Sequence, residues 1–109
     1  MDEIKEITDK ILEFRDERDW KQFHNAKDLA LAISIEASEL NECFLWKDAQ
    51  EANEERVKEE LADIMNYCFL LADKYKFDVK QIIFDKIEKN NQKYPAHKSK
   101  GTSKKYNEL

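Results

Sequence analysis

Apolar residues recur at helical spacing along most of the chain, which predicts four helices. The first helix is expected over about residues 2–19, where one face carries Ile4, Ile7, Ile11 and Phe14. The others are expected from about Ala26 to Trp46, Glu54 to Tyr75 and Val79 to Lys93. The single glycine and the single proline both lie after residue 94, so the strongest helix breakers are absent from residues 1–94. Four helices with short polar connections predict an all-α fold that resembles a four-helix bundle.

The second expected helix is the most apolar of the four. It is hydrophobic nearly all round between Leu29 and Ile35, so we expect it to be central and buried. Asn25 suits the N-cap before this helix, and Asp78 suits the N-cap before the fourth. Both caps have a polar residue three positions later, Asp28 and Gln81 respectively, which favours these helix starts.

The C-terminal residues differ from the rest in composition and charge. Residues 95–109 are rich in Lys and Ser, and we expect an irregular basic tail there after a helical domain over 1–94. The formal net charge is −5, yet the stretch from Lys93 to Leu109 carries +4, which leaves −9 on the rest. An acidic body does not suit a duplex nucleic-acid binder, and it does suit a protein that binds divalent cations.

Composition also bears on the location and the assembly of the protein. No window reaches the roughly 18 apolar residues of a membrane span, and the acidic, amphipathic N-terminus does not resemble a signal peptide. Cys43 and Cys68 stand apart in apolar helical stretches, so we interpret them as reduced core thiols. These features predict a cytoplasmic protein. At 109 residues, of which 39% are charged, the chain builds only a modest core, which favours self-association.

Two pairs of carboxylates occupy unexpected positions in the apolar helices. Glu36 and Glu39 lie in the second expected helix, and Glu60 and Asp63 lie where the apolar run of the third begins. The i, i+3 spacing places each pair on one helix face, where like charges repel and burial is costly without a partner. If the two helices pack antiparallel, the pairs face one another. Four oxygen ligands without His or Cys favour a hard cation, Mg²⁺ or Mn²⁺.

Two other interpretations of the carboxylates remain. They can be ordinary solvent-exposed helix positions, like most acidic residues of the chain. A di-iron bundle would require Glu-x-x-His motifs. The fourth position of each motif is instead Glu39 or Asp63, and both histidines, His24 and His97, lie outside the helices. Redox iron is therefore disfavoured.

The spacing Glu36-x-x-Glu39, then 20 residues, then Glu60-x-x-Asp63 resembles the metal motif of the MazG-like, all-α NTP pyrophosphohydrolase superfamily. The segments 14–24, 44–47, 94–97 and 104–109 are similar to those of its dCTP pyrophosphatase branch. The resemblance implies a MazG fold and a homo-oligomer, either a tetramer built from two dimers or a dimer. It also implies Mg²⁺-dependent hydrolysis of a nucleoside triphosphate to the monophosphate and pyrophosphate.

The resemblance also implies roles for individual residues. Glu36, Glu39, Glu60 and Asp63 would hold Mg²⁺ bound to the triphosphate, and Glu39 is our candidate for the general base. Substrate contacts are expected from Trp20, Trp46 and Tyr67 near the base and from Lys86, Asn90, Lys93 and Tyr94 near the phosphates. The chain departs from the mammalian-type pattern at two places: Ile11 replaces a polar histidine near the base, and Asn91-Gln92 replaces a basic pair.

Several alternatives stay open at this point. The substrate can be dCTP or a related or modified dNTP, dUTP, a damaged dNTP or phosphoribosyl-ATP. Outside enzymes, the chain can be a helical interaction module, such as an antitoxin-like dimer, or a divalent-ion sensor. A Walker-type NTPase is disfavoured because one glycine cannot build a Gly-rich phosphate loop. His24 is interpreted as satisfying loop backbone rather than as a chemical group.

Overall fold

The computed structural model describes residues 2–109, and helices dominate it. The elements in chain order are α1 (Glu3–Glu17), η1 (Trp20–Phe23), α2 (Ala26–Glu42), η2 (Ala49–Glu51), α3 (Glu54–Lys74), α4 (Val79–Lys93), α5 (Ala96–Ser99) and η3 (Tyr106–Glu108). No strand occurs within residues 2–109, so the all-α prediction is confirmed. The chain divides into two compact units, residues 1–77 and 78–109. No helix in the described part of the chain is long and apolar enough to cross a membrane.

Side-chain caps fix where the long helices begin. The Asn25 side chain accepts a hydrogen bond from the Asp28 amide (2.8 Å), and Asp78 accepts one from the Gln81 amide (3.0 Å). Both predicted caps are thus confirmed. Asn53 caps α3 in the same way, by accepting from the Glu55 amide at 3.0 Å. Each cap satisfies an amide that the first turn of a helix cannot pair internally.

The second helix is shorter than its hydrophobic pattern predicts. We expected it to reach Trp46, but α2 ends at Glu42, and residues 43–47 form successive turns. Trp46 has φ 61°, the left-handed conformation, which a continuing α-helix cannot contain. The prediction was wrong here because apolar spacing does not report the backbone reversal that leads into η2. Asp19 and Lys76 adopt similar left-handed values (55° and 59°) where α1 and α3 have ended.

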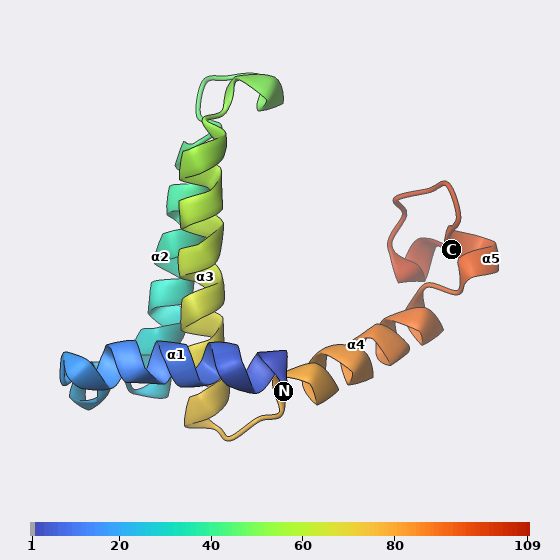
Figure 1. Cartoon of the computed structure of the whole chain (residues 1–109). Helices are drawn as coiled ribbons and strands as arrows, with labels where there is room; N and C mark the ends of the chain where they lie inside the picture. The colour runs from blue at the N-terminus through green and yellow to red at the C-terminus, as the bar shows by residue number, and fades with distance from the viewer. Residues whose placement is uncertain (1) are drawn as a thin grey trace. The chain divides into compact units, whose positions relative to one another are not determined.

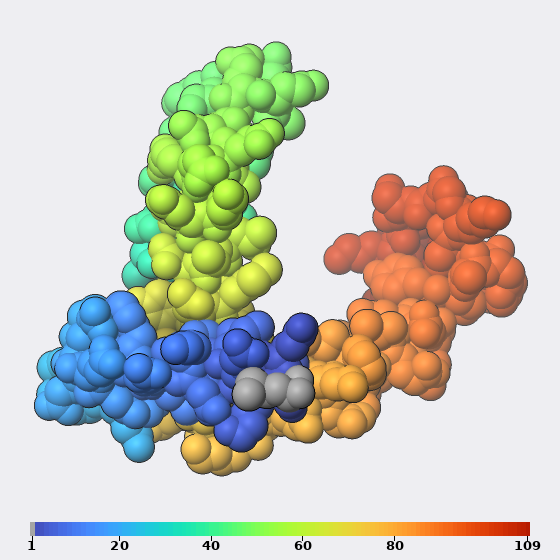
Figure 2. Space-filling view, viewed as in Figure 1, coloured from blue at the N-terminus to red at the C-terminus, as the bar shows by residue number. Residues whose placement is uncertain are grey.

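In the first unit, α2 and α3 lie side by side and α1 crosses α3 (Figure 1). In the space-filling view the α2–α3 hairpin projects from α1 as a narrow column (Figure 2). The buried apolar side chains among the described residues are Leu29, Cys43, Leu70 and Ala72. The α2–α3 pairing therefore forms the core, and it places the two carboxylate pairs on facing helices.

A single chain leaves much of its apolar surface open. We expected α2 to be buried nearly all round, yet Leu31 is 55% exposed and Ile35 is half exposed. Leu61 and Met65 of α3 are similarly open. Cys43 is buried as predicted, whereas Cys68 is exposed. In a single chain, the prediction that Cys68 is a core thiol was therefore wrong. The reason is that two paired helices cover only one side of each other.

The second unit contains α4, α5 and η3. Ile82, Ile83 and Ile87 form the apolar stripe of α4, and about half of each side chain is exposed. Residues 95–109 contain two short helical segments, α5 and η3, where we expected only irregular chain. The first compact unit ends at Phe77. The domain boundary that the sequence suggested, near residue 94, stays a prediction.

Candidate metal and nucleotide site

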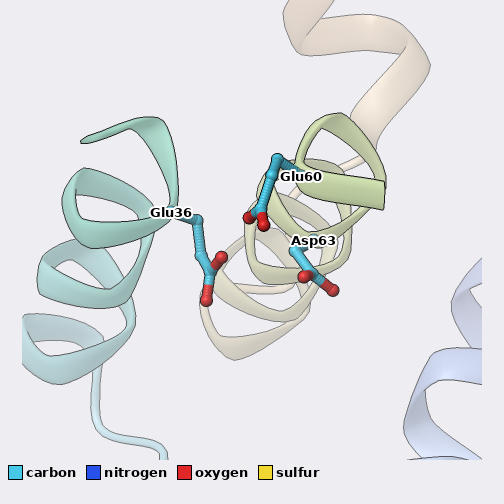
Figure 3. Close-up of side chains that lie close together, drawn as sticks. All are labelled: Glu36, Glu60 and Asp63. Carbon is cyan, nitrogen blue, oxygen red and sulfur yellow. The ribbon is translucent and has the colours of Figure 1, made fainter. Parts of the chain in front are cut away.

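Three of the four predicted metal ligands come together between α2 and α3. Glu36 on α2 and Glu60 and Asp63 on α3 each offer a carboxylate oxygen, and these oxygens lie within 4.8 Å of one another. Figure 3 shows the three side chains converging from the two helices. The i, i+3 spacing of Glu60 and Asp63 places both on the face of α3 that meets α2. The antiparallel arrangement suggested by the sequence therefore builds the cluster.

The cluster is electrostatically unsatisfied as it stands. Glu36 Oε2 and Glu60 Oε2 are buried and have no hydrogen-bond partner among residues 2–109. Burial, followed by the neighbouring Glu39 carboxyl, raises the pKa of Glu36 from its ordinary value of 4.5 to about 7. Burial and Glu39 also raise the pKa of Glu60. A buried carboxylate that accepts no hydrogen bond ionises readily only beside a positive charge. The cluster therefore suits a bound cation.

This donor set fits a hard divalent cation. All the converging atoms are carboxylate oxygens, the ligands that Mg²⁺ and Mn²⁺ prefer. The two buried oxygens without partners are in the positions where metal coordination would satisfy them. The structure therefore contains a candidate divalent-cation site, formed by Glu36, Glu60 and Asp63.

Glu39 borders this cluster without belonging to the closest group. It is half-buried one turn after Glu36 on α2, and its charge contributes to the raised pKa of both Glu36 and Glu60. Its backbone carbonyl accepts a long hydrogen bond from the Cys43 thiol (3.6 Å), in the first turn after α2. Glu39 is thus near the cluster while its carboxylate lies outside the three-residue group.

A pocket of about 480 Å³ adjoins the carboxylates within the first unit. Glu36 and Asp63 line it together with Trp20 and Tyr67, so two predicted aromatic contacts share a cavity with two carboxylates of the cluster. Burial and then the charge of Glu36 raise the pKa of the Tyr67 hydroxyl, which keeps that hydroxyl protonated as a hydrogen-bond donor. This volume is in the range of small-molecule sites.

The aromatic wall of the pocket is held by local contacts. Phe14 and Trp20 meet edge to face, with ring centroids 5.8 Å apart. The Arg18 guanidinium lies 3.7 Å from the centroid of the Phe14 ring. Ile11, the position that departs from the mammalian-type pattern, also lines the pocket. The wall is therefore apolar and aromatic, as stacking of a base requires.

Trp46 lies apart from this pocket. It is 94% exposed at the turn that follows α2, and the residues that line the pocket do not include it. The structure of one chain thus does not bring Trp46 together with Trp20. Contacts within its own chain therefore do not offset the backbone strain of Trp46.

The predicted phosphate contacts lie in the second unit. Lys86 and Lys93 line a basic groove of about 520 Å³ together with Lys89 and Lys98. The Tyr94 amide donates to the Asn90 carbonyl at 2.7 Å, and the Tyr94 ring meets Tyr106 edge to face at 6.2 Å. The lysines therefore share one groove, a suitable environment for an anion.

Sequence reasoning missed three polar residues of the first pocket. Lys10, Arg15 and Asn66 line it, and we had assigned no role to any of them. Asn66 had a usable signal, since it lies three positions after Asp63 on the same helix face. Arg15 had no such signal, because its sequence context resembles any charged helix end.

The chain is similar to known proteins over most of its length. The model of the MazG-like family matches residues 31–109. dCTP pyrophosphatase 1 of Mus musculus is 40% identical over 105 residues, and the protein of that name from Homo sapiens is 37% identical. Each alignment covers 89% of this chain and 62% of the relative, so the chain spans less than two thirds of those proteins.

A solved structure agrees with the fold. It is a pyrophosphatase from Archaeoglobus fulgidus, 36% identical, with a TM-score of 0.81, and the match covers 87% of this chain and 94% of that one. The residues matched by the family model include Glu36, Glu60 and Asp63. The chain therefore belongs to the MazG-like family.

Proposed function

We propose that this protein is a Mg²⁺-dependent nucleotide pyrophosphohydrolase that converts a nucleoside triphosphate to the monophosphate and pyrophosphate. The observation that carries the proposal is the cavity in which Glu36 and Asp63, two members of the three-carboxylate cluster, lie beside an aromatic wall. A bound nucleotide fits this cavity, because the carboxylates would hold the metal of its triphosphate and the aromatic wall would stack on its base. The relatives named pyrophosphatases support the same reaction.

The carboxylates divide into two roles in this proposal. Glu36, Glu60 and Asp63 hold the cation, because their oxygens converge and two of them lack other partners. Bound Mg²⁺ would neutralise the triphosphate and polarise the attacked phosphorus. Glu39, half-buried beside the cluster, takes the proton of the attacking water as general base.

We propose that the aromatic wall binds the base of dCTP or of a related or modified dNTP. Trp20 and Phe14 offer ring surfaces, and Tyr67 offers a hydroxyl near the carboxylates. Stacking is tolerant of base identity, so preference comes from shape and edge contacts. Ile11 contributes a methyl-bearing edge to the pocket, which favours a pyrimidine that carries an apolar substituent.

We further propose a homo-oligomer, most simply a tetramer built from two dimers. The exposed apolar residues of α2 and α3 need a covering surface, and a second copy supplies one of matching character. In this assembly Trp46 is buried against another copy and contacts the nucleotide base that the other copy binds. Lys86, Asn90, Lys93 and Tyr94 contact the phosphates of the substrate.

A panel of nucleotides with Mg²⁺ tests the reaction. Ion-exchange separation should yield nucleoside monophosphate and intact pyrophosphate, with dCTP or a modified dCTP turned over fastest. Nucleoside diphosphate and orthophosphate as first products would refute the proposed reaction. Binding of Mg²⁺ without turnover of any nucleotide would favour a divalent-ion sensor, and full turnover in EDTA would exclude the metal role.

A further inference from the structure

A second, smaller cavity of about 200 Å³ lies in the first unit. It is built where residues at the ends of α1 and α3 meet η1 and the start of α2. The charged and titratable groups that face it are Arg15, Lys21, His24, Asp73, Lys74 and Lys76. The metal-cluster carboxylates do not line this cavity, and it shares Arg15 and Leu70 with the larger pocket.

Positive charge exceeds negative charge in this cavity. Four cationic side chains face one carboxylate, Asp73, which lies 3.8 Å from an Arg15 guanidinium nitrogen and 3.6 Å from the Lys76 ammonium. Arg15 is only 9% exposed, and its Nε donates to Asp16 at 2.8 Å. Lys21 and Lys74 have no ion-pair partner among residues 2–109. A buried guanidinium with unneutralised neighbours attracts an anion.

His24 supplies a second and independent observation. Its Nδ1 is buried and has no hydrogen-bond partner among the described residues, although we had expected this histidine to satisfy loop backbone. Burial, and then the charges of Arg15 and Lys74, lower the pKa of its imidazole. With a proton on Nδ1, the ring would donate a hydrogen bond to an anionic oxygen, and the charges of Arg15 and Lys74 would stabilise that oxygen.

We propose that this cavity binds a free tetrahedral oxyanion of the inorganic phosphate class, held by Arg15, Lys21, His24 and Lys74. The cavity is smaller than the roughly 300–1,000 Å³ of typical small-molecule sites, so it suits the anion alone and not a nucleotide. The site takes no part in the proposed hydrolysis. Because Arg15 lines both cavities, a bound anion would fix one wall of the nucleotide pocket.

NMR titration of His24 tests this site without any activity measurement. Free imidazole added to the same samples serves as the reference for His24. Inorganic phosphate is added without divalent metal, against KCl at equal ionic strength to control for screening. We expect the apparent pKa of His24 to rise by about 0.5 to 1 with phosphate and that of the free imidazole to stay constant. Glycerol phosphate, a phosphate ester, should shift His24 less than phosphate, because the cavity excludes its glycerol group.

Substitutions at the rim of the cavity decide whether the shift comes from this site. Lys74→Met should weaken phosphate binding at least about tenfold, and Asp73→Asn should strengthen it by removing the competing carboxylate. Lys58→Met, an exposed change on the same helix, is the matched control and should leave binding unchanged. If these cations only complement the C-terminal ends of α1 and α3, phosphate will not move His24 in any variant. That result, or equal shifts of His24 and of the free imidazole, would overturn the proposal.

Discussion

Replacing Glu36 by glutamine should stabilise the protein in the absence of metal, although it removes a proposed metal ligand. The folded state holds the pKa of Glu36 at about 7 rather than 4.5, so this carboxyl binds a proton more tightly when folded. Stability should therefore fall as pH rises from the unfolded value toward about 7 and then stay level. The amide cannot ionise, so Glu36→Gln removes the contribution of Glu36 to this fall, whereas Glu60, whose pKa is also raised, still contributes.

The size of the effect follows from the pKa and from the solvent exposure of the side chain. The full rise from 4.5 to about 7 corresponds to about 3 kcal/mol between the two protonation states. Glu36 is only half-buried, and screening by water reduces this figure to about 1 kcal/mol at about pH 8. For a chain of this size, that gain raises Tm by about 4 °C.

Urea and thermal unfolding at about pH 4 and about pH 8, with and without Mg²⁺, measure both parts of this prediction. Mg²⁺ at about ten times its Kd should add roughly 1.4 kcal/mol to the wild type and little to Glu36→Gln. Glu59→Gln, an exposed change on α3, should behave like the wild type. A metal-free Glu36→Gln protein that is less stable than the wild type at about pH 8 would refute the reasoning on burial and repulsion. Equal stabilisation of both proteins by Mg²⁺ would refute the ligand role.

Three further predictions concern catalysis, recognition and assembly. Asp63→Asn should reduce kcat/KM at least about 100-fold with helicity by circular dichroism unchanged, whereas retained turnover would remove Asp63 from the site. Trp20→Ala should weaken binding of a non-hydrolysable dCTP analogue about 5- to 150-fold by fluorescence or calorimetry, and Phe23→Ala, an exposed aromatic of the same segment, should not. Light scattering at micromolar concentration should give a multiple of 13.0 kDa, and a monomer at that concentration would contradict the covering of α2 and α3 by another copy.

Local patterns in the sequence were sufficient to predict the helices and the acidic cluster. Helical periodicity and the caps at Asn25 and Asp78 depend on near neighbours only, and both reappear in the structure. The carboxylates stood out because Glu36 and Glu60 interrupt apolar stretches. Residues whose environment depends on contacts distant in sequence were missed. Arg15, for example, becomes buried only because the end of α1 packs against α3.

The residues with left-handed backbone that follow α1, α2 and α3 are Asp19, Trp46 and Lys76, and none of them is a glycine. Each such residue costs roughly 1–2 kcal/mol relative to a relaxed backbone. Lys76 regains part of this through its approach to Asp73, and Gln22 donates a hydrogen bond to the Asp19 side chain. Trp46 regains nothing within its own chain, since its side chain lies almost wholly in solvent. The turn after α2 should therefore open at a lower free energy than the turns after α1 and α3, and its amide hydrogens should exchange faster than theirs until another surface covers the indole.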